Sequence, residues 1–310
     1  MSGLCAIACY FNPQGYERRR QNYHRFRKHL AVPLVTVELG FSGRFDLARQ
    51  DADILVQIPG RDVMWQKECL LNIAARHVPA EFDAIAWLDC DVVFEREDWA
   101  ASAVRALETH PLVQLFSHAY YMGRNWAPGL DAEEHVERKR PSMGSALSSG
   151  VCISDVLSPV SADMRSNAYT GGLAWAIRRE LLEKHWLYDA NILGGGDRTL
   201  AGAALGAISY TTDWNGFSER HADHFKSWAN AFFSDLTGAV SGIPGRIYHL
   251  WHGDLVNRGY GIRHRILQEH DFDPRTDIKK NSLGVWEWAS NKPVLHHRVA
   301  DYFAHRKEDG

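Results

Sequence analysis

The sequence is poor in cysteine, and its five cysteines are scattered. None belongs to a Cys-x-x-Cys motif: they are Cys5, Cys9, Cys69, Cys90 and Cys152. This pattern excludes a disulfide-stapled scaffold and is typical of a reducing, intracellular compartment. Long apolar runs are also missing, because the run Leu4–Phe11 is too short to span a bilayer and follows no basic signal-peptide region. We therefore expect a cytoplasmic protein without a transmembrane segment.

A strong net charge is absent as well, since 35 Lys and Arg against 38 Asp and Glu give a formal net charge of −3. This near balance argues against a dedicated nucleic-acid-wrapping protein but leaves room for local basic patches. Hydrophobic residues make up 45% and charged residues 24% of the 310 residues, which excludes a mainly disordered chain. A chain of this length buries about three-quarters of its surface, enough for a core without disulfide or metal staples.

Apolar runs alternate with helix-like segments through the first hundred residues. Four runs are predicted strands, over residues 4–11, 33–39, 53–58 and 82–94. Two segments between them are predicted helices, over residues 17–30 and 63–78. This alternation is typical of an α/β fold with a Rossmann-like, mostly parallel sheet flanked by helices.

The character of the sequence changes after Tyr121. Residues 122–168 are rich in Gly, Ser and Pro and show little periodicity, which is typical of a flexible loop or lid. Beyond them, strands are predicted over 170–179 and 247–252, and helices over 179–187 and 198–205. We therefore expect one main domain whose two halves, 1–121 and 169–310, are joined by the segment 122–168.

The sharpest local signal is Asp89-Cys90-Asp91, within the apolar run 82–94. Ligands of open α/β sheets bind at the carboxyl ends of the strands, and two carboxylates there must be solvated or paired. Mg²⁺ or Mn²⁺ would be a suitable partner, because hard divalent cations prefer carboxylate and phosphate oxygens. The alternative for an isolated motif of this kind is two ordinary aspartates in a polar turn.

Three further features are compatible with the same site. Lys67 extends the apolar stripe of its helix toward the N-terminus, where it either points at a phosphate or snorkels to solvent. Residues 194–197, Gly-Gly-Gly-Asp, combine a close backbone approach with a carboxylate that could also be an N-cap. His249 and His252 fall at opposite phases of a predicted strand, so one could bind metal while the other packs in the core, and Gly253 favours His252.

Together these segments resemble the nucleotide-diphospho-sugar glycosyltransferases of the GT-A fold, which carry a D-x-D motif. The matching segments occur in the family's order: 6–12, 65–68 with Asn72, 86–94, 170–175, 194–197 and 249–253. The resemblance implies a hexosyl- or pentosyltransferase that moves a sugar from a nucleoside-diphosphate sugar to an acceptor hydroxyl, with Mn²⁺ or Mg²⁺ as cofactor. Residues 1–121 would then be the nucleotide-sugar-binding half, and 169–310 the acceptor-binding half with a C-terminal extension.

The same resemblance implies which residues hold the donor: Tyr10, Asn12, Lys67, Asn72, Asp89, Gly171 and Gly172. Tyr10 and Asn12 would lie near the nucleotide base. Lys67 and Asn72 would approach the ribose or the phosphates. The two glycines would let the acceptor lie close to the donor.

The resemblance also implies a metal shell and a catalytic base. Asp91 would bind the metal, and Asp89 would contact the ribose, the metal or a metal-bound water. His252, or else His249, would complete the shell. Asp197 would face the acceptor hydroxyl as a general base, although many relatives have a Glu-Asp or Glu-Asn pair where this chain has Asp-Arg.

The acceptor stays open at this stage. A surface or lipid-linked glycan is expected from family frequency, and a hydroxylated DNA base, flipped out of the duplex as in phage-type DNA modification, is the alternative. Basic residues interleaved with aromatics over 16–28 and 258–265 suit nucleic acid or peripheral contact with an anionic membrane, or are solvated helix faces.

Two functions of another class are also compatible with these motifs. A metal-dependent phosphohydrolase is one, because the D-x-D segment looks like the nucleophile strand of haloacid-dehalogenase-type phosphatases, although that strand usually comes first in the chain. A non-catalytic nucleotide-sugar binder is the other, and it would not need Asp197.

Overall fold

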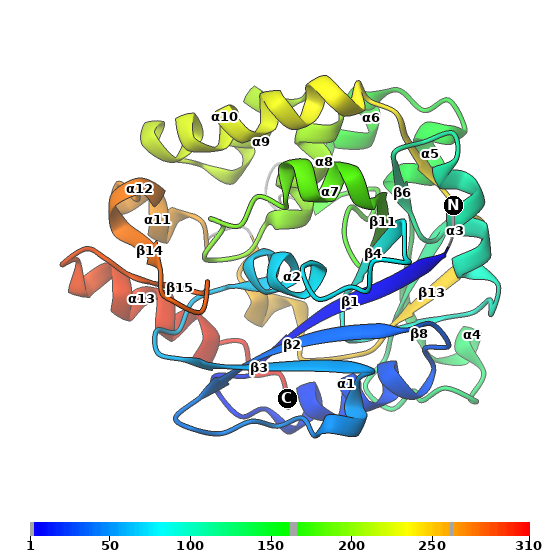
Figure 1. The fold of residues 1–310 in the computed structure, drawn as a ribbon, viewed down its shortest axis with the longest axis horizontal. Helices are drawn as coiled ribbons and strands as arrows, with labels where there is room; N and C mark the ends of the chain where they lie inside the picture. Colours follow the sequence, from blue (N-terminus) through cyan, green and yellow to red (C-terminus); the bar gives the residue numbers. More distant parts are fainter. Residues whose placement is uncertain (1–2, 162–165, 261–262) are drawn as a thin grey trace.

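A seven-stranded, mostly parallel sheet forms the centre of the computed structural model, which describes residues 3–161, 166–260 and 263–310 (Figure 1). Its strands are β1 (Leu4–Phe11), β2 (Leu34–Phe41), β3 (Ile54–Gly60), β4 (Ala84–Leu88), β6 (Leu112–Gln114), β11 (Ala174–Arg178) and β12 (Val240–Gly242). They lie in the order β12-β6-β11-β4-β1-β2-β3, and only β11 runs against its neighbours. The expected α/β class is thereby confirmed.

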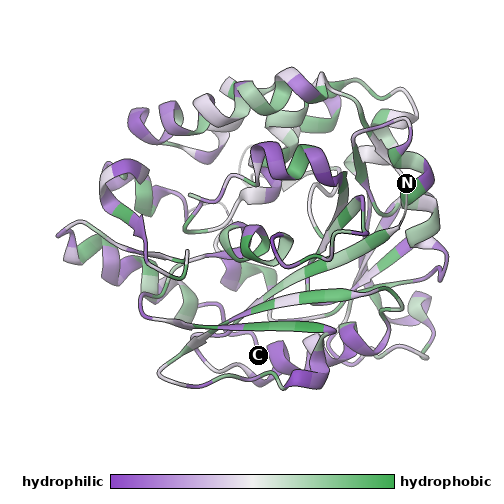
Figure 2. Cartoon of the chain, in the orientation of Figure 1, coloured by the Kyte–Doolittle hydropathy of each residue, from purple (hydrophilic) through white to green (hydrophobic). Residues whose placement is uncertain are grey.

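Helices cover both faces of this sheet, because its central strands are apolar on both sides. Successive residues of β1 point to opposite faces, so Ile7 packs in the core that α2 (Lys67–Ala75) joins, and Ala6 and Ala8 pack in the core that α1 (Glu17–Lys28) joins. The hydropathy colouring shows β1 mainly in green, the apolar end of the scale (Figure 2). Two cores, one on each face, therefore hold the sheet.

The other helices fall on these two sides or in the connections. They are α3 (Trp99–Leu107), α4 (Ala132–His135), α5 (Met143–Ser148), α6 (Ile153–Leu157), α7 (Arg179–His185), α8 (Gly196–Ala204), α9 (Ile208–Asn215), α10 (Glu219–Leu236), α11 (Arg265–Glu269), α12 (Pro274–Asp277) and α13 (Pro293–Ala304). Short 3₁₀ turns occur at Arg49–Asp51 and Leu255–Arg258. Within the described part of the chain, no helix combines the length and the apolar character that crossing a membrane requires.

A second sheet of four strands lies beside the first, in the order β5-β13-β7-β8. Its strands are β5 (Val92–Phe94), β7 (His118–Met122), β8 (Val136–Pro141) and β13 (Arg246–His249). The prediction of one continuous strand over 82–94 is therefore wrong, because the chain leaves the first sheet after β4 and enters the second at β5. Asp89 N donates to Leu173 O, and Leu250 N donates to Asp91 O, both at 2.8 Å. The D-x-D segment is thus the crossing between two sheets.

The segment 122–168 contains more regular structure than its composition indicates. Besides β8, α4, α5 and α6, it includes the paired strands β9 (Pro159–Ser161) and β10 (Ser166–Asn167). A lid function for this segment stays a prediction, and residues 162–165 lie outside the described part. The last pair of strands is β14 (Ile278–Lys280) with β15 (Trp286–Trp288).

The C-terminal segment 305–310 returns from α13 to the start of α1. Tyr16, the residue before α1, offers no side-chain cap to that helix. The Asp309 carboxylate accepts hydrogen bonds from Glu17 N at 3.2 Å and from Arg18 N at 2.7 Å instead. A carboxylate at a helix N-terminus satisfies free N–H groups and offsets the helix dipole, so Asp309 stabilises the start of α1.

Candidate functional site

A cavity of about 780 Å³ opens where the parallel strands end. Its lining includes Cys9 and Phe11 at the end of β1, and residues 88–91 after β4. Residues 171–173, before β11, and residues 195–198, at the start of α8, complete this side of the wall. The cavity therefore occupies the position at which open α/β sheets bind their ligands.

Lys67, the first residue of α2, joins two carboxylates in this cavity. Its Nζ lies 2.6 Å from Asp89 Oδ1 and 3.0 Å from Asp197 Oδ1. Burial would lower the pKa of Lys67, but the two carboxylates outweigh it and hold that pKa well above its usual value. Burial likewise raises the pKa of Asp89 to about 6, against the opposing effect of Lys67. At neutral pH the lysine is a fixed cation that positions both aspartates.

The Gly-Gly-Gly-Asp turn before α8 is shaped by close side-chain contacts. Gly195 has a φ of 97°, in the region that favours glycine. A Cβ on Gly196 would lie 1.8 Å from Glu68 Oε1, and one on Gly172 would lie 2.5 Å from Asp197 Oδ2. Side chains of this chain make these close contacts, and the approach of a phosphate or an acceptor to the glycines stays a prediction.

A group of three metal-ligand side chains lines the same cavity. Asp91 comes from the crossing between the sheets, and His249 ends β13. The strand predicted over 247–252 stops at His249, so His252 lies three residues beyond it. One ligand atom from each lies within 4.8 Å of the others. His252 Nε2 is 3.0 Å from Asp91 Oδ2 and 3.3 Å from His249 Nε2. The structure thus brings both candidate histidines to Asp91, whereas Asp89 lies against Lys67.

These three residues fit a divalent cation on chemical grounds. Asp91 Oδ1 is buried without a hydrogen-bond partner among the described residues, and a buried carboxylate oxygen is costly to leave unsatisfied. Burial lowers the pKa of His249 to about 3, although Asp91 opposes this shift, so the imidazole is neutral at pH 7. Neutral imidazole and ionised carboxylate are the protonation states that bind metals.

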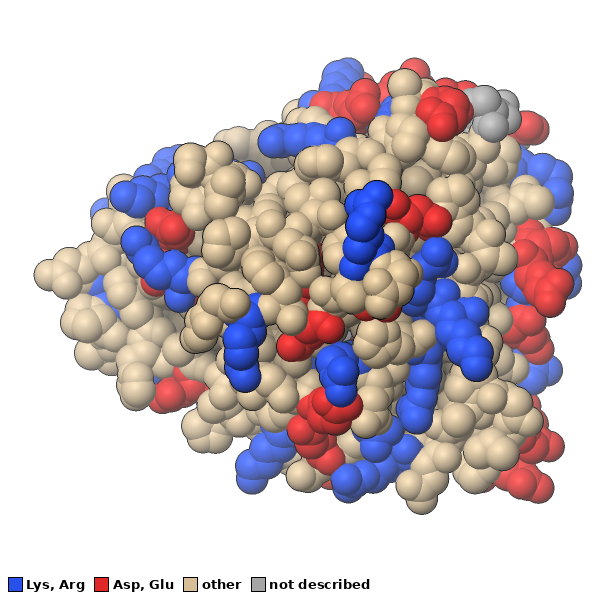
Figure 3. Space-filling view, turned by 60° about the horizontal axis from the view of Figure 1, so that its bottom comes forward, with Lys and Arg blue, Asp and Glu red and all other residues tan. Residues whose placement is uncertain are grey.

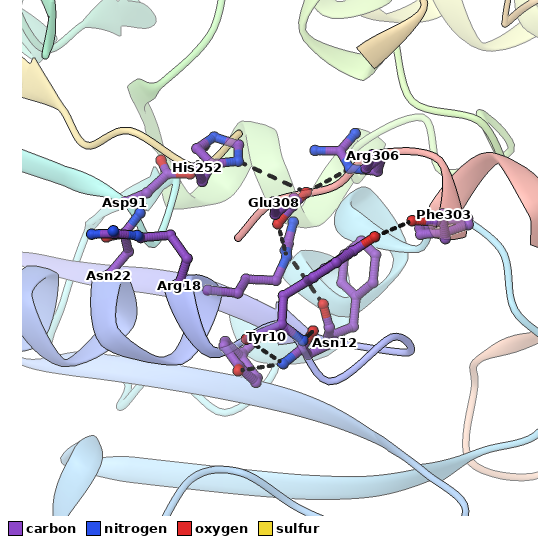
Figure 4. Close-up of polar contacts among 12 residues, drawn as sticks. Tyr10, Asn12, Arg18, Asn22, Asp91, His252, Phe303, Arg306 and Glu308 are labelled. Atoms are coloured by element: carbon purple, nitrogen blue, oxygen red, sulfur yellow. Dashed lines mark hydrogen bonds and ion pairs between the residues drawn. The ribbon is translucent and has the colours of Figure 1, made fainter. Parts of the chain in front are cut away.

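Glu308 supports His252 from the side away from Asp91 (Figure 4). Its Oε1 lies 3.8 Å from His252 Nδ1, and the carboxylate is held by Arg19 Nε at 3.0 Å and Arg306 Nε at 2.5 Å. Glu308 is 1% exposed. A carboxylate behind a ligating histidine fixes the orientation of the ring and raises its basicity. Glu308 is therefore a positioning residue of this group.

Replacing Glu308 by Gln should weaken Mn²⁺ binding about tenfold, because the amide no longer supports the His252 ring with a negative charge. Glu308→Asp should restore most of the affinity. Free Mn²⁺ can be titrated by electron paramagnetic resonance, with Glu95→Gln as a control for losing an exposed carboxylate that pairs with Arg246. Unchanged Mn²⁺ affinity with a lowered melting temperature would restrict Glu308 to a structural role.

Three residues predicted to hold the donor are engaged elsewhere and are not among the described residues that line the cavity. The Tyr10 hydroxyl and the Asn12 amide both donate to Asp46 Oδ2, at 2.8 and 2.9 Å, and so hold the loop after β2 against the end of β1. The Asn72 amide bonds both backbone groups of Leu187 at 2.8 and 2.9 Å. Their placement corrects the expectation that they approach the base, ribose or phosphates.

Several cavity residues were missed because their partners are distant in sequence. Tyr121, Arg138 and Arg306 line the wall, as do Phe11, Arg19 and Trp65, which lie in segments that the sequence did single out. Arg258, Tyr260, Arg263 and His264 line it too, and for these the basic composition of 258–265 was a signal. The other basic segment, over 16–28, forms mainly α1 and contributes Arg19 alone among its described residues.

Glu68 makes the stability of the fold depend on pH. Burial raises the pKa of Glu68 to about 8, with partial compensation by Lys67. The folded state then keeps a proton that the unfolded chain releases, so stability decreases between about pH 5 and pH 8. Glu68→Gln should melt a few degrees higher than the original protein at pH 8 and nearly equally at pH 5. The exposed Glu180→Gln is the control, and a constant difference across this range would contradict the assignment.

Comparison with known proteins adds distant similarities. No family model matches the chain, and no curated protein matches it. The chain is similar to S. aureus TarS 1–349 (10% identity, TM-score 0.37, 98% of this chain and 89% of that chain). It is also similar to the mannosyltransferase PcManGT from Pyrobaculum calidifontis in complex with GDP-Man and Mn²⁺ (14% identity, TM-score 0.41, 96% and 69%). A Drosophila galactosyltransferase 7 mutant with manganese, UDP-Gal and xylobiose gives 13% identity and a TM-score of 0.30, over 64% and 59%. Because all three TM-scores are low, the function of the site has to be inferred from its own residues.

Proposed function

We propose that the protein is a metal-dependent glycosyltransferase that moves a sugar from a nucleoside-diphosphate sugar to an acceptor hydroxyl. One observation carries this proposal. A single cavity holds a metal-ligand group, Asp91 with His249 and His252, and a separate carboxylate, Asp197, fixed by a buried lysine. Sugar transfer from a diphosphate needs a cation at the leaving group and a base at the attacking hydroxyl.

Asp91, His249 and His252 would hold the metal, which supplies Lewis-acid stabilisation of the leaving diphosphate. Arg258 and Arg138 flank this group and would bind the phosphates. Arg258 Nη2 donates to His252 O at 3.4 Å, and Arg138 lies 4.1 Å from the Tyr121 ring centre, which is 5.1 Å from the His249 ring. Charge-assisted bonds from guanidinium groups are well suited to phosphate oxygens.

Asp197 would act as the base. Lys67 binds its Oδ1, so Oδ2, which lies over Gly172, is the oxygen that takes the acceptor proton. The acceptor oxygen forms a bond to the anomeric carbon as the bond from that carbon to the diphosphate breaks, and the diphosphate leaves with the electron pair. Lys67 keeps Asp197 aligned before transfer.

The ligand atoms of the metal-ligand group favour Mn²⁺ over Mg²⁺. Mg²⁺ is usually bound through oxygen ligands, whereas two of the three side chains here offer imidazole nitrogen. Two histidines and one carboxylate also hold Fe²⁺ in non-haem oxygenases, so a metal screen must include Fe²⁺. Oxygenase chemistry gives no role to Asp197 and Lys67.

The expected division of the chain needs one refinement. Asp91 comes from the half 1–121, and His249 and His252 come from the half 169–310, so we propose that both halves bind the donor. A glycan acceptor, the cytoplasmic location and peripheral membrane contact stay proposals, as does a hydroxylated DNA base.

A thermal-shift screen of nucleoside diphosphates and sugar nucleotides, with Mn²⁺, Mg²⁺, Fe²⁺ or a chelator, tests this function. A ligand that binds only the folded state raises the melting temperature. We expect a Mn²⁺-dependent shift with one nucleotide class, followed by release of that nucleoside diphosphate during transfer. No shift would contradict the proposal. Release of inorganic phosphate from phosphate esters would indicate a phosphohydrolase, and binding without turnover a nucleotide-sugar binder.

A further inference from the structure

The cavity has more positive charge than its own carboxylates offset. Three of its cations are paired: Lys67 with Asp89 and Asp197, and Arg19 and Arg306 with Glu308. Arg138, Arg258 and Arg263 have no carboxylate within 4.0 Å in the described part of the chain. Arg258 and Arg263 are only 6% and 8% exposed. Buried cations without a protein counter-ion indicate that a bound anion completes the site.

The proposed donor accounts for only part of this charge. A nucleotide-sugar diphosphate carries about two negative charges, and a divalent cation already offsets about two. Arg138 and Arg258 stand at the metal-ligand group, where the diphosphate would lie. Arg263 lies away from the metal-ligand group, so the proposed diphosphate gives it no binding partner.

Arg263 lies against the turn that leads to Asp197. Its guanidinium atoms are 3.2 Å from where a Cβ on Gly194 would be, and the neighbouring His264 ring is 3.0 Å from the equivalent point on Gly195. Nη1 donates to the Tyr302 hydroxyl at 3.0 Å, and Nε donates to His264 Nε2 at 3.3 Å. These bonds fix the guanidinium group in the wall of the cavity, which Arg263 lines.

Arg198 adds a second arginine to the lining of the cavity on this side. It follows Asp197 directly and lies 4.1 Å from the centre of the Trp214 ring. Burial lowers the pKa of Arg198 to about 10, and the nearby Arg263 contributes to the shift. Two partly desolvated cations in proximity repel each other, and an anion between them would offset that repulsion.

We propose, on the basis of the glycosyltransferase function above, that the acceptor carries a phosphate group, which Arg263 and Arg198 bind beside the hydroxyl that Asp197 deprotonates. A phosphate monoester has about −1.5 to −2 charges at pH 7, which matches two guanidinium groups better than one carboxylate does. A nucleotide and a sugar phosphate share this chemistry. The phosphate takes no part in bond making and orients the acceptor.

The face shown in Figure 3 does not have the charge pattern of a nucleic-acid-binding surface. Carboxylates lie among the Lys and Arg side chains there, so this face is not a field of one sign. The recognition proposed here is a buried, local contact of two arginines, unlike the continuous basic surface that backbone-binding nucleic-acid proteins use.

Inorganic phosphate is the first probe, titrated calorimetrically into protein saturated with Mn²⁺ and the nucleoside diphosphate that the thermal-shift screen selects. Arg263→Gln should weaken phosphate binding about tenfold or more, because it removes a charge-assisted hydrogen bond. Arg263→Lys, which keeps the charge, should lose less. Arg105→Gln is the control, since that exposed side chain bonds only Ser102 among the described residues. Equal phosphate binding by the original protein and Arg263→Gln would overturn the proposal.

Transfer to matched acceptor pairs then identifies the source of the phosphate. One pair is a hydroxylated nucleoside and its monophosphate, and the other is a hexose and its phosphate ester. We expect one phosphorylated member to have a kcat/KM about tenfold above its neutral partner, and Arg263→Gln to remove the preference. Equal use of both members in each pair would overturn the inference, whereas failure of the nucleoside diphosphate to bind would overturn the proposed function itself.

Discussion

Replacing Asp91 by Ala should reduce Mn²⁺ affinity by more than about a hundredfold and abolish Mn²⁺-dependent donor binding. Asp91 is the only carboxylate among the three candidate ligands, and its Oδ1 has no hydrogen-bond partner in the described part of the chain. Changing residues behind metal ligands already costs 10- to 100-fold in affinity, so losing a direct ligand should cost more. The measurement is a Mn²⁺ titration followed by calorimetry with the selected nucleoside diphosphate.

The fold should survive this substitution. His249 is neutral at pH 7, so removing Asp91 leaves no unpaired charge on that ring. Asp98→Ala is the matched control, because it deletes an exposed aspartate that pairs with Arg96. If the Asp91 variant kept its Mn²⁺-dependent nucleotide binding while folded, the metal assignment would be wrong.

Asp197→Asn is expected to lower the rate of sugar transfer by about 10²- to 10⁴-fold, the usual contribution of general base catalysis. The amide oxygen can still accept from Lys67 Nζ, so the geometry of the site should persist. It cannot take a proton from the acceptor hydroxyl. Donor affinity should stay within a few-fold of the original, because the metal-ligand group is untouched.

Asp189→Asn provides the comparison for this change, since Asp189 also pairs with a lysine, Lys280, but is not among the described residues of the cavity. Transfer should be measured under saturating donor so that kcat reports the chemical step. Full activity of the Asp197 variant would exclude it as the base and favour another carboxylate.

Local patterns of the sequence predicted the elements that surround the site. The strand over 4–11, the helix starting at the glycine turn before Asp197, and the placement of Asp89 and Asp91 at a sheet edge agree with the structure. Each depends on near neighbours in sequence. The predicted strand over 82–94 failed because its apolar residues continue from one sheet into another, and apolarity does not indicate a change of sheet.

The sequence alone did not predict the contacts between segments that are distant along the chain. Asn72 bonds Leu187, 115 residues away, and nothing near it distinguishes a backbone brace from a ligand contact. Glu308 and His252 meet only after α13 turns back toward α1. The pairing of Lys67 with Asp197 spans 130 residues, so sequence could predict both as site residues without predicting that they touch.

The packing of residues 305–310 against α1 has a consequence for biosynthesis. These are the last residues of the site to leave the ribosome, after Asp91, His249 and His252 are already out. Until they emerge, α1 lacks the Asp309 carboxylate at its start and His252 lacks Glu308. We expect a chain stopped after Ala304 to bind Mn²⁺ more weakly than the full chain, which a titration of the two would show. The nascent chain would then bind its metal at full affinity only after residues 305–310 have left the ribosome.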